Sequence, residues 1–188
     1  MGMPQAARRW TAELVRALPD DGNRYEVIAG ELFVTPAPRP IHQAAVTTLL
    51  WRLHPYVRAH ELGEVFASPA DIEFDVETLV QPDVFVAPLV AGRLLREWAE
   101  IKRLRLAIEI VSPSTASADR TVKRRLFQRQ GVPEYWIVDL EARVIERWRP
   151  GDERPEILAE TITWLCEAGV APLVIDLPEF FAEVLDER

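Results

Sequence analysis

Two apolar segments that each contain one carboxylate constrain the fold of this chain more than any other feature. Glu109 interrupts the strongly apolar segment Leu104–Val111, and Asp83 begins the apolar segment 83–87. A buried, ionised carboxylate is costly unless it is paired, hydrogen-bonded or bound to a metal ion. The fold must therefore either expose Asp83 and Glu109 to water at the edge of a sheet or place a cation beside each of them.

Short extended segments alternate with helical segments along the sequence. Runs of apolar residues, some strictly alternating, predict strands at 25–29, 32–35, 64–67, 71–76, 83–87, 104–111, 135–139, 144–148, 157–160 and 173–176. Helices are expected at 5–18, 41–60, 117–130 and 178–185. Pro55 is expected to kink or end the second helix, and Ser117 is expected to cap the third. This order of elements predicts an α/β or α+β fold in which helices flank a mixed β-sheet.

The length of the chain, 188 residues, corresponds to a single domain. We expect a helical extension over residues 1–23 and one domain over residues 24–188. Every apolar run is shorter than the roughly 18 residues of a transmembrane helix, and the N-terminus has no recognisable signal peptide. The sequence therefore predicts a soluble, cytoplasmic protein that does not enter a membrane.

Several signatures of well-known enzyme classes are missing. The sequence has no G-x-G-x-x-G, no G-x-x-x-x-G-K-[ST], no H-E-x-x-H and no G-x-S-x-G. These absences argue against a serine hydrolase and against a small-molecule enzyme that uses a bound cofactor. If the strand ends that carry Asp83 and Glu109 are adjacent, the two carboxylates form an oxygen site suited to Mg²⁺ or Mn²⁺. A capped or solvated strand end is the alternative for each acid.

Basic residues are concentrated in one part of an otherwise acidic chain. The net charge is −8, but residues 101–130 hold eight basic and two acidic residues, so this stretch carries +6 and the rest carries −14. Basic surfaces favour contacts with phosphates. We therefore expect a local DNA-binding face on the predicted helix 117–130, formed by Arg120, Arg124, Arg125 and Arg129. A solvated helix surface is the alternative.

Five short segments occur together in the order seen in a known family. They are Tyr25–Leu32 with the following Pro36, Pro38 and His42; Pro82-Asp83; Glu109–Thr115; Asp119-Arg120 with Lys123; and Gly131–Asp139. Together they resemble the Uma-two family, which belongs to the restriction-endonuclease-like PD-(D/E)XK nuclease superfamily. The resemblance covers about Arg24 to Phe180 and implies a restriction-endonuclease-like core. Ala29 departs from it, because an acidic residue is usual at that position.

The resemblance implies that Asp83 and Glu109 are catalytic metal ligands and that the backbone carbonyl of Ile110 completes a Mg²⁺ or Mn²⁺ site. Strict (D/E)-x-K spacing would place a lysine at position 111, where this chain has Val111. The family's lysine is matched instead by Lys123 on the following helix. At 1.5 Å per residue this position is roughly 9 Å from the expected start of that helix, so a long side chain can reach back to the two acids. A solvated lysine in a basic run is the alternative.

Two further residues match family positions with weaker roles. Glu31 is expected as a third carboxylate, and His42 is expected to contact substrate or to brace a ligand. For each residue, a structural role in a turn or a helix cap is the alternative. The function expected is that of a metal-dependent DNA endonuclease, in which Lys123 orients or helps to deprotonate the attacking water. A homodimer would suit the cutting of two strands. A non-catalytic module that keeps a nuclease-like sheet to bind DNA or protein is the alternative, favoured by Val111 and by the net charge.

Overall fold

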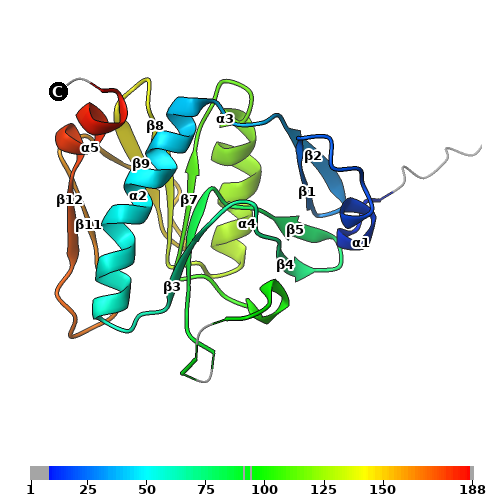
Figure 1. Cartoon of the computed structure of the whole chain (residues 1–188), viewed down its shortest axis with the longest axis horizontal. Helices are drawn as coiled ribbons and strands as arrows, with labels where there is room; N and C mark the ends of the chain where they lie inside the picture. Colours follow the sequence, from blue (N-terminus) through cyan, green and yellow to red (C-terminus); the bar gives the residue numbers. More distant parts are fainter. Residues whose placement is uncertain (1–8, 91, 94, 187–188) are drawn as a thin grey trace, which may run out of the picture.

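The computed structural model describes residues 9–90, 92–93 and 95–186 (Figure 1). The strands are β1 (Arg24–Ile28), β2 (Glu31–Thr35), β3 (Glu64–Ala67), β4 (Ile72–Asp75), β5 (Thr78–Val80), β6 (Val84–Ala87), β7 (Leu106–Ile110), β8 (Glu134–Asp139), β9 (Val144–Trp148), β10 (Glu156–Leu158), β11 (Thr161–Trp164) and β12 (Leu173–Asp176). The α-helices are α1 (Ala12–Arg16), α2 (Pro40–Ala59), α3 (Ala116–Ala118), α4 (Arg124–Arg129) and α5 (Leu177–Val184). A 3-10 turn, η1, covers Trp98–Glu100, and a π-helical turn, η2, covers Asp119–Lys123 between α3 and α4.

Six strands form the central sheet, in the order β10-β9-β8-β7-β6-β3. Strands β7 and β8 are parallel, and the other neighbours in this sheet are antiparallel. Parallel strands need a long crossover connection, and here that connection contains α3, η2 and α4. The predicted fold class, a mixed sheet flanked by helices, is therefore confirmed.

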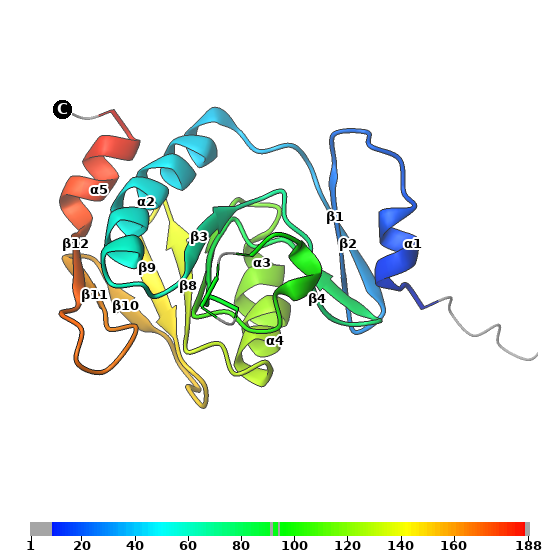
Figure 2. The same ribbon diagram turned by 60° about the horizontal axis from the view of Figure 1, so that its bottom comes forward.

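Strand β7 contributes to two hydrophobic cores, because successive residues of a strand face opposite sides of the sheet. Leu106, Ile108 and Ile110 pack in the core under α2 and α5. Ala107 faces the other side, where it shares a core with Phe127 of α4. Figure 2 shows β8 and β9 between the pair α2 and α5 on one side and α4 on the other. Burial on both faces explains why the sequence of β7 is apolar at four of its five positions.

The strands β2-β1-β5-β4 form a separate antiparallel sheet at the end of the molecule opposite α5 (Figure 1). Ile28 and Val80 of this sheet share a core with Phe127 of α4. Val27 points the other way and packs with Val15 of α1. The small sheet therefore covers the α4 side of the central sheet, and α1 covers its outer face.

Two local expectations are corrected by the structure. Helix α2 continues through Pro55 to Ala59, so Pro55 does not end the helix; the fully buried Leu53 and Val57 hold it on both sides of the proline. The helical segment after β7 begins at Ala116, so Ser117 is not its cap.

The N-terminal prediction lies partly outside the described residues. Residues 5–8 of the expected helix 5–18 are not described, and within the described part α1 begins after Thr11, whose Oγ1 accepts a hydrogen bond from the Leu14 N–H. Strands β5 and β11 have no counterpart among the predicted elements.

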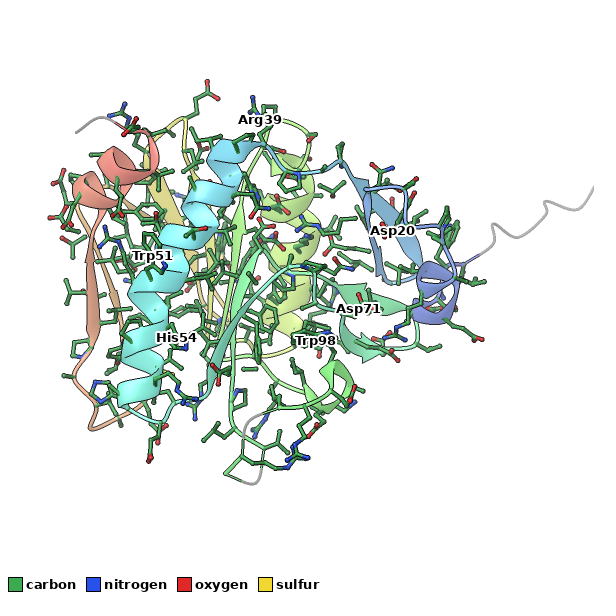
Figure 3. The ribbon with its side chains drawn as sticks, viewed as in Figure 1. Asp20, Arg39, Trp51, His54, Asp71 and Trp98 are labelled. Carbon is green, nitrogen blue, oxygen red and sulfur yellow. The ribbon has the colours of Figure 1, made fainter. Side chains whose placement is uncertain are left out.

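Helix α2 is the longest helix, at 20 residues, and it is apolar on one face only. Figure 3 shows Trp51 and His54 on the side of α2 that faces away from the sheet, and Trp51 is 68% exposed. In the described ranges, no helix has the length and apolar character that crossing a membrane requires.

Candidate active site

Asp83 and Glu109 converge at one end of the central sheet. Strands β6 and β7 are antiparallel and pair Val84 with Ile108, so the residue before β6 lies beside the end of β7. The Ile110 N–H donates a 2.8 Å hydrogen bond to Asp83 Oδ2. Both carboxylates are nearly inaccessible, with 2% and 1% of their surfaces exposed. The structure thus brings together the two acids that interrupt apolar segments.

Side-chain alternation places both carboxylates on the α4 side of the central sheet. Phe85 and Ala107 face the core on that side. Glu109 lies two residues after Ala107 on β7, and Asp83 lies two residues before Phe85, directly before β6. The helical segment η2–α4 and the small sheet cover this side of the sheet. The two acids therefore lie between layers of protein, where each needs a partner.

Asp83 is surrounded by hydrogen-bond donors. Arg24 Nη1 lies 2.6 Å from Oδ1, and His42 Nε2 lies 3.0 Å from Oδ2, beside the Ile110 N–H. Burial raises the pKa of Asp83, but the hydrogen bond from His42 and the charge of Arg24 outweigh burial, and the pKa lies below its ordinary value. Asp83 is therefore an anion at neutral pH.

Lys123 is buried between carboxylates from two different sheets. Its Nζ lies 2.8 Å from Glu26 Oε2, 2.8 Å from Glu109 Oε1 and 3.7 Å from Asp119 Oδ1. Burial lowers the pKa of Lys123, but the charges of these three acids raise it by more, so the pKa lies above its ordinary value. The ammonium stays protonated and neutralises buried acids.

Local structure explains how these groups meet. On β1, Glu26 and Ile28 share a face, and Ile28 packs in the core between the small sheet and the central sheet. The π-helical turn η2 begins at Asp119 and ends at Lys123, and both are buried. Single π-helical turns are rare in proteins, but those that occur are often located at functional sites. The crossover therefore presents a cation and an acid to the carboxylates of β1 and β7.

Among the described residues, the cluster contains more acidic than basic side chains. Its buried carboxylates belong to Glu26, Asp83, Glu109 and Asp119, and its permanent cations belong to Arg24 and Lys123. Burial raises the pKa of Glu109 well above its ordinary value and also raises the pKa of Asp119, although Lys123 opposes both shifts. The raised pKa values favour the neutral forms of Glu109 and Asp119 in the absence of other cations beside them, and Lys123 holds these two acids by hydrogen bonds and charge.

The donor set at this place fits magnesium or manganese. Asp83, Glu109 and the Ile110 carbonyl would supply oxygen ligands, which Mg²⁺ prefers. Within residues 9–90, 92–93 and 95–186, no three or more His, Cys, Asp or Glu side chains are grouped as a metal site. Mg²⁺ commonly uses only one or two carboxylates and completes its shell with water and substrate phosphates, so two acids suffice for this ion.

Asp83 and Ile110 line a cleft of about 1360 Å³. One wall is formed by residues that lead into β1, and the other by the loop 111–116 and the start of α2. Figure 3 shows Arg39 at the start of α2 and Asp20 on the N-terminal side, and both line the cleft. Asp83 therefore lies at the wall of this cleft, behind Arg24 and His42, which contact its carboxylate and also line the cleft.

Of the two supporting residues expected from the sequence, the structure brings only His42 to the cluster. Glu31 is exposed at the start of the edge strand β2, opposite Ile28, and it lies away from Lys123. The acid of this hairpin that contacts Lys123 is Glu26, at 2.8 Å. No local pattern marks Glu26 as the buried acid, because its burial depends on the packing of the small sheet against the central sheet.

The arginines of the expected basic face differ in their surroundings. Arg120 is paired with two carboxylates, at 2.6 and 2.7 Å, and lines the cleft. The Arg124 guanidinium lies over a tryptophan ring, 4.7 Å from its centre. Arg125 and Arg129 are exposed. Arg120 and Arg124 are therefore held by contacts within the protein, whereas Arg125 and Arg129 lie on the surface.

Comparisons with known proteins give a family match and a structural match. A family model described as "Uma2: Putative restriction endonuclease" matches residues 12–177. A solved structure described as a "putative nuclease belonging to DUF820 from Anabaena variabilis ATCC 29413" has 17% sequence identity and a TM-score of 0.73, and the match covers 93% of this chain and 99% of that chain. At this identity the likeness shows a shared fold. A search of curated proteins found no match.

The family match extends from α1 to the first residue of α5. It includes every segment that carries the resemblance seen in the sequence, and that resemblance is confirmed: the chain belongs to the Uma2 family.

Proposed function

We propose that this protein is a metal-dependent endonuclease that hydrolyses phosphodiester bonds in DNA. One observation carries the proposal: Asp83 and Glu109, from neighbouring antiparallel strands, share a buried position beside an open cleft. The descriptions of the Uma2 family, "Putative restriction endonuclease", and of the structure from Anabaena variabilis, "putative nuclease", support it.

Asp83, Glu109 and the carbonyl of Ile110 would hold Mg²⁺ or Mn²⁺. Such an ion supplies Lewis-acid chemistry, since it polarises a phosphoryl oxygen and lowers the pKa of bound water. Asp83 suits a ligand that also faces a substrate, because it is ionised and lines the cleft. Glu109 is more enclosed and is held by the Lys123 ammonium.

The surroundings of Lys123 support a positioning role rather than the activation of water. Its ammonium is protonated, 4% exposed, and 2.8 Å from Glu109. A protonated amine cannot accept a proton from water. We therefore assign Lys123 the task of fixing Glu109 and offsetting buried negative charge. His42 fixes Asp83 in a similar way from the cleft side.

The groups that line the cleft suit a phosphate backbone. Arg24, Arg39 and Arg120 line it together with the hydroxyl groups of Ser112 and Ser114. Arginine and serine side chains are common phosphate partners in protein–DNA contacts. The exposed Arg125 and Arg129 would extend the contact over the helical surface, and a homodimer would bring two such sites to a duplex.

A non-catalytic module that binds DNA or protein is the second candidate, and Arg24 favours it. The Arg24 guanidinium lies 2.6 Å from Asp83 Oδ1, an atom that a metal ion would use. Val111 also stands where the strict superfamily motif has a lysine. A module of this kind binds DNA equally well with and without a divalent metal.

Cleavage assays on single-stranded, duplex and branched DNA separate the two candidates. The parent protein is expected to cut at least one form in Mg²⁺ or Mn²⁺, and EDTA is expected to stop it. Asp83→Asn keeps the shape of the side chain but loses its charge, so it should abolish cleavage. Glu153→Gln changes an exposed acid between β9 and β10 and serves as the matched control. DNA binding without cleavage under every metal condition would establish the module instead.

A further inference from the structure

Arg24 links the buried carboxylate cluster to the cleft. Its Nη1 donates to Asp83 Oδ1 at 2.6 Å and to Ser68 Oγ at 3.3 Å. The side chain is 19% exposed and lines the cleft. Its Nε is buried and, among the described residues, has no hydrogen-bond partner. The guanidinium is thus held mainly by one carboxylate, and part of its donor capacity is unused.

The position of Arg24 overlaps with that of a metal ion bound to Asp83. Asp83 Oδ2 already accepts from the Ile110 N–H and contacts His42, which leaves Oδ1, the oxygen that Arg24 holds. Burial lowers the pKa of Arg24, but the charges of Asp83 and Glu109 raise it by more, so the guanidinium already neutralises the acids of the site. Two cations on one buried oxygen repel each other strongly. Arg24 and a divalent cation therefore exclude one another at Oδ1.

A guanidinium that leaves Asp83 has an alternative anion in a bound substrate. Arginine presents a planar fork of N–H groups that matches a phosphate, and such charge-assisted bonds are strong. A phosphate in the cleft beside Asp83 would lie within the region that Arg24 lines. It would also offer an acceptor to the unused Nε.

We propose that Arg24 couples the binding of a divalent cation to the binding of a backbone phosphate. Its guanidinium neutralises Asp83 until a cation does so, and then pairs with the phosphate. This inference rests on the proposed function, since it assumes a metal site at Asp83 and a phosphodiester substrate. By linkage, each ligand then strengthens the binding of the other. Without Arg24, the cation alone binds more tightly and the phosphate binds more weakly.

Titration of the full-length protein with Mn²⁺ in the absence of DNA tests the competition. Arg24→Gln removes the charge and is expected to bind Mn²⁺ about tenfold more tightly than the parent, within the usual range of coupling between sites. Arg24→Lys keeps the charge, and its Mn²⁺ affinity should remain close to that of the parent. This charge-preserving variant shows whether the effect of Arg24→Gln comes from the lost charge rather than from a change in the fold. Arg154→Gln, at an exposed arginine before β10 and outside the cleft, should leave Mn²⁺ affinity unchanged.

Binding of a single-stranded oligonucleotide in Ca²⁺, followed by fluorescence anisotropy, tests the second half. Arg24→Gln is expected to bind the oligonucleotide about tenfold more weakly than the parent. Equal Mn²⁺ affinity in the parent and Arg24→Gln, or tighter Mn²⁺ binding by Arg24→Lys as well, would overturn the coupling and leave the nuclease proposal standing. Absence of Mn²⁺ binding in the parent and in both Arg24 variants would overturn both proposals.

Discussion

The Lys123 ammonium lies 2.8 Å from Glu109 Oε1, although the two residues are 14 positions apart in the sequence. Glu109 is on β7, and Lys123 ends the π-helical turn of the crossover that leads to the parallel strand β8. The crossover returns over the same face of the sheet that carries the acid. One strand–helix unit thus supplies both a buried carboxylate and its counter-ion.

Removal of the Lys123 charge should destabilise the fold strongly. Lys123→Met leaves the carboxylates of Glu26 and Glu109 without their common cation, and loss of one partner of a buried ion pair costs about 3–5 kcal/mol. Lys102→Met is the matched control, because it changes the other lysine of the chain, which is exposed, and should stay within about 0.5 kcal/mol. Urea unfolding measures both. A small loss in Lys123→Met would mean that the buried acids are held in another way.

Glu26 and Lys123 should act as one unit. Each single change, Glu26→Gln or Lys123→Met, disturbs the same 2.8 Å contact. Contacting residues usually deviate from additivity by about 0.5–3 kcal/mol. The double variant should therefore lose less stability than the two single variants together. Strict additivity in a double-mutant cycle of unfolding free energies would contradict the described cluster.

The sequence predicted the elements that carry Asp83, Glu109 and Lys123 better than it predicted the residues that pair with these side chains. The apolar segments around Asp83 and Glu109 predict the two strands, and the helix expected at 117–130 matches the continuous helical segment from α3 to α4. These elements are predictable because burial on both faces leaves a continuous apolar pattern, with each acid as an evident exception.

Arg24 and Glu26 escaped prediction for a physical reason. They lie on β1, in a different sheet from Asp83, and no local pattern reveals that this sheet packs against the α4 side of the central sheet. Glu31 matched a family position but lies at an edge strand in water. Which acid of a hairpin is buried depends on the layer that covers the hairpin, and that is decided by tertiary packing.

Substitutions of the arginines between residues 117 and 130 should have two different effects, one on stability and one on DNA binding. Arg120→Ala breaks two ion pairs and should lower the free energy of unfolding by about 1–2 kcal/mol. The loss is smaller than for a fully buried ion pair, because Arg120 is about one third exposed and solvent screens its charge. Arg125→Ala should leave stability unchanged and, if this side chain contacts a phosphate, reduce the slope of log affinity against log salt by about one. Oligonucleotide binding across a salt series measures this slope. An unchanged slope would return Arg125 to the solvated helix surface.

Gly63 should be far less tolerant of substitution than Gly131. Both have positive φ, 143° and 67°, but a Cβ at Gly63 would overlap the Ala87 carbonyl, whereas a Cβ at Gly131 would meet open space. Gly63→Ala should therefore cost about 2–3 kcal/mol, and Gly131→Ala about 1 kcal/mol. Thermal unfolding of the two variants compares them. Equal losses would show that the close approach of Gly63 to the end of β6 is not a constraint.

Anomalous diffraction from crystals soaked in Mn²⁺ tests the metal site most directly. The account predicts a peak about 2 Å from carboxylate oxygens of Asp83 and Glu109, with Arg24 moved away from Asp83 Oδ1, and no such peak in Asp83→Asn. A peak only elsewhere, with Arg24 still paired to Asp83, would contradict a metal-dependent nuclease at this site.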